Sequence, residues 1–198
     1  MTMKKALLLS AGLAALSTAP ALAGGFAEPA QPPVTIAPAP VAPSANWTGF
    51  SVGGQLGYGD VSTSGPSLGG NDYTYGLRAY YDYDFGNFIL GGGLQYDNTG
   101  IDLGGVTTLD SVTRLGLRAG VDLGQNWVYG TAGLAQARTS NPAVGDSNGW
   151  FAGAGYEVFV ASNVTFGAEL LYHEFDSFDL PGLEANATTA SLSVNFRF

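Results

Sequence analysis

Apolar and polar residues alternate one by one along most of the chain after Trp47, and this period of two constrains the fold more than any other feature. Such alternation predicts β-strands with one apolar and one polar face. No apolar run of about 18 residues follows the N-terminal segment, so a protein that spans a membrane with helices is excluded. The clearest strand ends the sequence, where Ala190, Leu192, Val194, Phe196 and Phe198 alternate with Ser191, Ser193, Asn195 and Arg197.

Two kinds of connection separate the alternating segments. Three connections are tight and contain asparagine, at residues 86–87, 124–126 and 161–163. Longer polar stretches lie near residues 60–71, 98–108, 139–148 and 175–187, and three of them hold Pro66, Pro142 and Pro181. Proline is excluded from paired strands, so its placement supports the same division. The expected strands are the segments 49–58, 73–85, 88–97, 112–123, 127–138, 150–160, 164–173 and 190–198.

Eight antiparallel strands with short turns at one end predict an all-β, up-and-down barrel. Its apolar face could point inward, as in a soluble lipocalin-like barrel, or outward into a membrane. Charged residues make up 12% of the chain, against about 25% in a soluble domain, which favours the membrane. In the segment 127–138 the sequence does not indicate which face is apolar and which is polar, and we expect Gln136 and Arg138 to point with the polar set.

Aromatic side chains occupy both ends of the expected strands on the apolar face, where membrane–water interfaces select them. Those near the tight turns include Phe50, Tyr83, Phe85, Phe88 and Phe166. Those near the long connections are Tyr58, Tyr73, Tyr75, Tyr96, Trp150 and Tyr172. The prediction is therefore a transmembrane barrel with lipid outside and a narrow polar lumen inside.

The N-terminus is expected to carry an export signal and a tether. Residues 1–23 combine Lys4 and Lys5, a short apolar stretch and a small-residue cleavage pattern at Ala21 and Ala23 before Gly24. Residues 24–45 hold six of the ten prolines, which favours an extended linker over a packed core. The barrel domain is expected to occupy residues 46–198.

The chain resembles the eight-stranded outer-membrane barrels of Gram-negative bacteria, particularly the opacity-protein-like and OmpA-like "porin family" proteins of alphaproteobacteria. The resemblance rests on the opening segment Asn46-Trp47-Thr48-Gly49-Phe50-Ser51-Val52-Gly53, on Gly-x-Gly repeats and on the ending Ser193-Val194-Asn195-Phe196-Arg197-Phe198. OmpA-type proteins carry a peptidoglycan-binding domain after the barrel, whereas this sequence stops at Phe198. Wall anchoring by that route is therefore not expected.

The resemblance also implies location, orientation and partners. It implies an outer-membrane protein with both termini in the periplasm and the long loops outside the cell. It implies contact with outer-membrane lipid, lipopolysaccharide, periplasmic chaperones and the barrel assembly machinery, and we expect a monomer. The terminal pattern Leu192, Val194, Phe196 and Phe198 resembles the signal that this machinery reads.

Charged residues on the polar face are expected to form a paired network inside the lumen, because an unpaired buried charge is costly. The charged residues that the alternation places on the inward face are Arg78, Arg114, Arg118, Arg197, Asp82, Asp122, Glu157 and Glu169. The network could act as a switchable gate in a narrow pore or as filling that closes the lumen. Eight strands leave an interior only wide enough for side chains, which favours filling.

Several other functions are excluded or disfavoured. The chain has no cysteine and a formal net charge of −9, which argues against thiol chemistry and nucleic-acid binding. Gly49-Phe50-Ser51-Val52-Gly53 matches a nucleophile-elbow pattern but sits within a strand, outside its strand–turn–helix context. His173 is the only histidine, so a two-histidine zinc site is excluded. We expect no cofactor, and acidic loops could bind divalent cations or simply be solvated.

Four functions remain, ordered by how well the residues fit them. The first is a structural, envelope-integrity role with surface presentation of the loops. The second is a low-conductance pore, and the third is a surface for binding or adhesion, for example to haem, host molecules or phage. The fourth is a lipid A-modifying enzyme that would use His173 with a serine and an acid; no serine is placed beside His173 by register.

Overall fold

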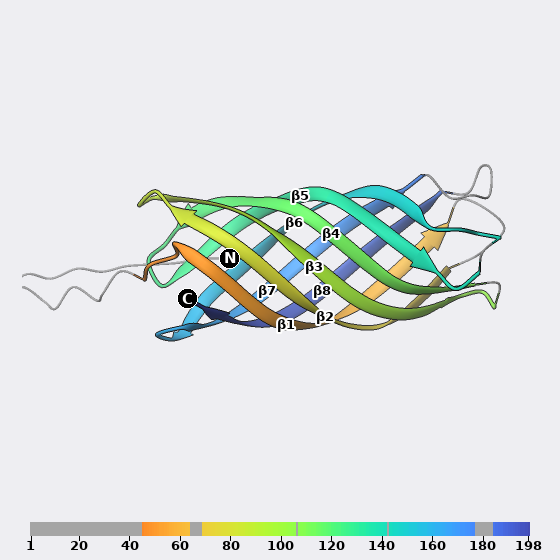
Figure 1. Cartoon of the computed structure of the whole chain (residues 1–198), viewed down its shortest axis with the longest axis horizontal. Coiled ribbons are helices and arrows are strands. Elements are labelled where there is room, and N and C mark those ends of the chain that lie inside the picture. Colours follow the sequence, from red (N-terminus) through yellow and green to blue (C-terminus); the bar gives the residue numbers. More distant parts are fainter. Residues whose placement is uncertain (1–44, 64–68, 106, 142, 177–183) are drawn as a thin grey trace, which may run out of the picture. The chain divides into compact units, whose positions relative to one another are not determined.

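The computed structural model describes residues 45–63, 69–105, 107–141, 143–176 and 184–198, and these residues form a closed barrel of eight strands (Figure 1). The expected signal peptide and nearly all of the expected tether lie outside the described residues. The strands are β1 (Gly49–Thr63), β2 (Gly69–Asp84), β3 (Phe88–Leu103), β4 (Thr107–Asp122), β5 (Asn126–Thr139), β6 (Ser147–Ala161), β7 (Val164–Phe175) and β8 (Ala185–Arg197).

Each strand pairs antiparallel with its neighbours in sequence, and β1 closes the barrel against β8 from Ser51↔Arg197 to Thr63↔Ala185. The predicted fold class is thereby confirmed. Closure leaves no sheet edge and satisfies backbone hydrogen bonds without water. No helix among the described residues is long and apolar enough to cross a membrane.

The three tight turns follow β2, β4 and β6, as predicted, and define one end of the barrel, called here the tight-turn end. Gly86 and Gly124 have φ angles of 99° and 87°, in the left-handed region that favours glycine. The opposite end, called the long-connection end, differs from the prediction. Residues 98–108 were expected to be a long polar connection, but β3 continues to Leu103 and β4 begins at Thr107.

The outward face is apolar and the inward face is mostly polar, which agrees with a barrel whose exterior meets lipid. Leu56, Leu77, Leu117 and Leu134 are all exposed by more than half on the outside, whereas Gln55, Arg78 and Arg118 are buried inside.

The prediction for the faces of β5 was wrong. Arg138 is 62% exposed on its side chain, lies outward near the long-connection end and pairs with Asp146 at 4.0 Å. Gln136 has the same strand parity and lies beside it. The inward positions of this strand are taken instead by Trp127 and Tyr129, which are almost fully buried. The two faces of β5 both carry apolar residues, so alternation alone cannot tell inside from outside.

Candidate functional site: the charged barrel interior

The lumen is filled by side chains, and its middle holds four arginines and four acids, called here the lumen network. The network comprises Arg78, Arg114, Arg118, Arg197, Asp82, Asp97, Glu157 and Glu169. Every member is exposed by 5% or less. Because the positive and negative members are equal in number, the formal charges of this buried network cancel.

Nearest the tight-turn end, four members form a closed ring of alternating charge. Arg118 donates to both carboxylate oxygens of Asp82, from Nε at 2.8 Å and from Nη2 at 2.6 Å, and its Nη1 donates to Glu157 at 3.1 Å. Arg197 Nη2 donates to Asp82 at 3.0 Å, and Arg197 Nη1 lies 3.7 Å from a Glu157 oxygen. Such bidentate, charge-assisted contacts are the strongest hydrogen bonds in proteins.

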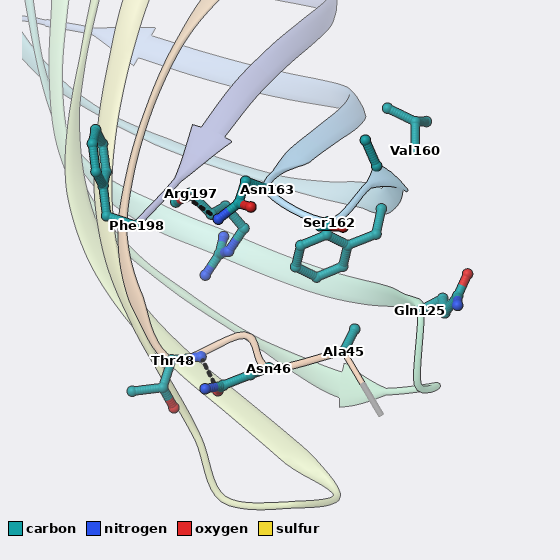
Figure 2. A pocket seen from close by; sticks show the side chains of 11 residues that line it. Ala45, Asn46, Thr48, Gln125, Val160, Ser162, Asn163, Arg197 and Phe198 are labelled. Atoms are coloured by element: carbon teal, nitrogen blue, oxygen red, sulfur yellow. Dashed lines mark hydrogen bonds between the residues drawn. The ribbon is translucent and has the colours of Figure 1, made fainter. Parts of the chain in front are cut away.

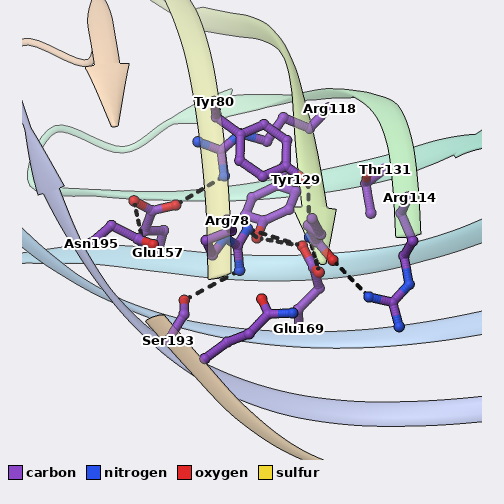
Figure 3. A network of polar contacts seen from close by, with 12 residues as sticks. Arg78, Tyr80, Arg114, Arg118, Tyr129, Thr131, Glu157, Glu169, Ser193 and Asn195 are labelled. Carbon is purple, nitrogen blue, oxygen red and sulfur yellow. Dashed lines mark hydrogen bonds and ion pairs between the residues drawn. The ribbon is translucent and has the colours of Figure 1, made fainter. Parts of the chain in front are cut away.

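Further along the lumen, the Glu169 carboxylate accepts hydrogen bonds from three side chains. Tyr129 Oη donates at 2.9 Å, Gln95 Nε2 at 2.8 Å and Arg78 Nη2 at 3.4 Å (Figure 3). Arg78 also donates to Ser193 Oγ at 3.2 Å. A buried carboxylate that keeps three donors recovers much of the solvation that it lost on burial.

The third group lies closest to the long-connection end. Arg114 pairs with Asp97 and donates from Nε to His173 Nε2 at 2.7 Å. Asp97 also accepts two hydrogen bonds from Gln55 Nε2, at 2.7 and 2.8 Å. Arg114 donates to Gln95 Oε1 at 3.1 Å, which links this group to the group around Glu169. His173 Nε2 therefore acts as an acceptor, held by an arginine.

Inward-facing glycines let these partners meet across an intervening strand. In the register Arg118↔Gly91↔Asp82, the middle residue has no side chain, and a Cβ at Gly91 would collide with the Asp82 carboxylate. The same arrangement recurs in Gln55↔Gly76↔Asp97 and in Tyr129↔Gly155↔Glu169. The glycine content therefore has a specific use, because each gap allows a long side chain to reach a partner two strands away.

An aromatic stopper closes the lumen at the tight-turn end. Trp47 precedes β1, is fully buried and packs against Trp127 and Phe159, with ring centroids 5.7 and 4.5 Å apart. Its indole Nε1 donates to Gly124 O at 3.0 Å, and its own carbonyl accepts from Arg197. The segment before the first strand is thus fastened to both the β4–β5 turn and the charged ring.

A pocket of about 610 Å³ opens beside this stopper at the tight-turn end. Figure 2 shows Asn46, Thr48 and Gln125 around one part of it and Ser162, Asn163 and Arg197 around another. Asn163 Nδ2 donates to the Arg197 carbonyl at 3.1 Å, which ties the last turn to the end of β8.

The other end of the lumen is filled by apolar side chains. These cluster around Phe151, Leu171 and Phe175, with Val61, Ile101, Leu103, Leu109, Val112, Ala135, Ala137, Ala185 and Ala187. An interior hollow beside Arg114 and His173 measures only about 20 Å³, which is space for about one water molecule. From one end to the other, the lumen therefore consists of aromatic, charged and apolar layers in contact.

Seven of the eight charged residues predicted to pair inside the lumen lie in the network, and Asp122 does not. Asp122 ends β4, and its carboxylate accepts from Gly124 N at 2.7 Å, so it caps a tight turn and takes no part in the ion pairs that the described residues show. Sequence reasoning also missed Asp97 and the tyrosines Tyr80 and Tyr129. Asp97 shares the parity of Gln95 on β3, and Tyr80 shares that of Arg78 and Asp82 on β2, so both had an available signal. Tyr129 had none, because both faces of β5 carry apolar residues.

All eleven aromatic residues of the predicted bands lie exposed on the outward side of the barrel. Neighbouring rings pack in pairs, such as Tyr58 with Tyr73 at 5.5 Å and Trp150 with Tyr172 at 5.9 Å at the long-connection end. At the other end, Tyr83 and Phe85 lie 4.7 Å apart. Among the described residues, no three acidic or histidine side chains gather closely enough to hold a metal ion.

The model of the outer membrane protein beta-barrel domain matches residues 8–198. The chain is 31% identical over 183 residues to the 22 kDa outer membrane protein of Rhizobium leguminosarum bv. viciae, covering 80% of this chain and 82% of that protein. It is 32% identical over 195 residues to the 25 kDa outer-membrane immunogenic protein of Brucella canis, covering 91% and 90%.

Solved structures with little sequence similarity share the fold. Neisserial surface protein A superimposes with a TM-score of 0.55 at 17% identity, covering 76% of this chain and 98% of that one. Ail, the attachment invasion locus protein of Yersinia pestis, gives 0.50 at 18% identity, covering 76% and 99%. The family match and the curated relatives confirm the expected location in the outer membrane. The chain belongs to the outer membrane protein β-barrel family.

Proposed function

We propose that this protein is a structural barrel of the outer membrane, with a closed lumen, that supports envelope integrity and presents its long connections at the cell surface. The observation that carries the proposal is that side chains fill the lumen from one end to the other. Four buried ion-paired arginines, the Trp47 stopper and an apolar cluster occupy the lumen in succession. A pore would require this whole series of contacts to separate, and separating buried ion pairs is costly.

We propose an orientation with the tight turns in the periplasm and the long connections outside. Under this orientation the cell-surface end is acidic, since Asp60, Asp72, Asp102 and Asp110 lie there among others, with Arg138 as the exposed base. Such a surface disfavours polyanionic ligands. The terminal residues Val194, Phe196 and Phe198 are exposed on the outside, where the assembly machinery could read them.

A catalytic role has little support in the lumen. His173 is buried, its Nε2 accepts from Arg114, and its Nδ1 lies 3.3 Å from the Ala187 carbonyl. Both ring nitrogens are therefore occupied by groups other than a serine hydroxyl. A lipid A-modifying site would need an accessible base beside a nucleophile, so the proposed function is not enzymatic.

The proposal is tested in a strain of the source bacterium that lacks the gene. Loss of the protein should increase sensitivity to detergent with a chelator, and wild-type protein on a plasmid should restore resistance. A lumen variant such as Arg118→Ala, expressed at equal folded level, should restore resistance less well because its barrel is less stable. A deletion strain as resistant as its parent would overturn the envelope role.

A further inference from the structure

Strands β1 and β8 are the two ends of the sheet in sequence order, and the barrel closes along their pairing, called here the seam. Every other neighbouring pair consists of consecutive strands, and the connection between such strands helps to fix their register. No connection does this at the seam. Ser51 lies opposite Arg197 and Leu56 lies opposite Leu192, so the side chains of the strands themselves must set this register.

Most of β8 would accept a different register. A shift by one residue would turn every side chain to the wrong face, but a shift by two residues keeps each side chain on its own face. The outward residues between positions 190 and 196 are all apolar, and the inward residues between positions 189 and 195 are all short and polar. A shift by two therefore exchanges similar side chains over this part of the strand.

One contact across the seam shows this tolerance. Arg78 on β2 reaches over β1 and donates to Ser193 Oγ on β8 at 3.2 Å (Figure 3). The register partner of Arg78 on β1 is Gly53, which has no side chain to obstruct the contact. A shift by two residues would bring Ser191 or Asn195 to the place of Ser193, and each has a side-chain oxygen that can accept the same hydrogen bond.

Arg197 is the exception, because it is the one charged residue of β8. Its guanidinium crosses β1 to donate to Asp82 on β2 at 3.0 Å, and it also donates to the carbonyl of Trp47, which precedes β1. Its other terminal nitrogen lies 3.7 Å from a Glu157 oxygen on β6. A shift by two residues would move the backbone of Arg197 about 7 Å along β1, away from Asp82 and Trp47.

The charged ring near the tight-turn end is balanced only when Arg197 is in place. Without it, Arg118 would be a single cation between two buried carboxylates, Asp82 and Glu157. A buried charge without a full partner is costly, so the register that brings Arg197 to Asp82 is favoured over the registers shifted by two. Buried polar residues fix the register of coiled coils in the same way.

We propose that Arg197 sets the register in which the barrel closes, through its ion pair with Asp82 across the seam. The lumen network then has a second role, because it selects the correct closed barrel as well as filling its interior. The glycine at position 53 and the short polar residues of β8 allow closure, and the single charge of Arg197 specifies it. This setting of the register is independent of any role of the protein in the envelope.

The test reads the seam register with pairs of cysteines, since the chain itself has none. Leu56→Cys combined with Leu192→Cys reports the register of the structure, because these two residues are partners and both are exposed on the outward face. Leu56→Cys combined with Ala190→Cys or with Val194→Cys reports the two shifted registers. Directly opposed residues lie about 5 Å apart and diagonal neighbours about 7–8 Å apart, so a disulfide forms readily only between opposed positions.

Each cysteine pair would be placed in the full chain, which is refolded into phospholipid vesicles and oxidised. The cross-link is measured only in the folded band, identified by its heat-dependent gel migration. Without a further change, the chain should cross-link at the native pair. Arg197→Gln should raise cross-linking at a shifted pair about tenfold, because the correct register no longer gains an ion pair. Arg197→Lys, which keeps the charge, should return the cross-link to the native pair.

The matched control is Arg114→Gln, which removes a different buried ion pair, the one with Asp97. The partners of Arg114 lie on β3 and β7, so this change leaves the seam intact. Arg114→Gln should therefore destabilise the barrel and still cross-link at the native pair. If Arg197→Gln yields no folded band, Asp82→Asn takes its place, because it removes the other end of the same ion pair.

Three results would overturn the proposal. Cross-linking at the native pair alone in folded Arg197→Gln would show that the ring stabilises the barrel without setting its register. Equal cross-linking at the shifted pairs in Arg114→Gln would show that loss of stability alone causes the shift. Cross-linking at the shifted pairs without any further change would show that Arg197 does not fix the seam.

Discussion

Removing the charge of Asp82 should destabilise the barrel more than any other single change in an acidic side chain. Asp82 is fully buried and accepts three N–H groups, two from Arg118 at 2.8 and 2.6 Å and one from Arg197 at 3.0 Å. In Asp82→Asn, two guanidinium groups would share Glu157 as their one remaining carboxylate, at 3.1 and 3.7 Å. Breaking a buried pair by removing one partner costs about 3–5 kcal/mol, and because asparagine keeps one acceptor we expect about 3 kcal/mol.

The assay is urea unfolding of the protein in lipid vesicles, followed by circular dichroism and by heat-dependent gel migration. Asp146→Asn is the control, because Asp146 pairs with Arg138 at 4.0 Å on side chains that are more than half exposed. An exposed pair contributes about 0–1 kcal/mol, so this variant should unfold almost like wild type. A loss below about 1 kcal/mol for Asp82→Asn would refute the reasoning.

A double change separates pairing from general disruption. Arg118→Gln alone should also be strongly destabilising, since it leaves Asp82 and Glu157 with Arg197. The double variant Asp82→Asn/Arg118→Gln should lose clearly less free energy of unfolding than the sum of the losses of the two single variants. The reason is that the second change removes a charge that the first had left without its partner. Additive costs would show that the two side chains do not act as a pair.

Three further predictions concern packing and hydrogen bonding in the lumen. Gly91→Ala should lower the free energy of unfolding by about 1–3 kcal/mol in the same urea assay, because the new Cβ would collide with the Asp82 carboxylate. Trp47→Ala should lose about 3–5 kcal/mol and make Trp127 fluorescence more sensitive to acrylamide, because the stopper that buries Trp127 is gone. Tyr129→Phe should lose about 1.5–3 kcal/mol, because it removes a charge-assisted hydrogen bond to Glu169.

Matched controls for these changes lie on the outward face. Gly130→Ala adds the same methyl group where the nearest atom is 3.9 Å away, and Tyr156→Phe removes a hydroxyl from an exposed ring. Each should remain within about 0.5 kcal/mol of wild type. Lumen variants that behave like these controls would show that the interior is loosely packed.

The fold could be predicted from the sequence because its signals are local. Alternation fixes which residues share a face, and tight turns such as Gly124–Asn126 mark where strands reverse. The signal failed in β5, where Trp127 and Tyr129 point inward while Val128 and Leu134 point outward. Both sets are apolar, so alternation does not decide which one enters the lumen; in the structure Trp127 packs there against Trp47.

The partners within the lumen could not be predicted, for a different reason. Whether Arg118 meets Asp82 depends on how far each strand is staggered against the next, and the period of two does not specify that stagger. The register places Gly91 between them, and this single position makes the contact possible. Asp122 shares the parity of Arg118, but it is the last residue of β4, where its carboxylate accepts a hydrogen bond from Gly124 N.

Conductance across a planar lipid bilayer tests the central claim, a closed lumen, most directly. Refolded wild-type protein should insert, as shown by protease protection, and give no reproducible current steps. Reproducible steps from wild type that Arg118→Ala abolishes would contradict the account and make the lumen network the gate of a pore.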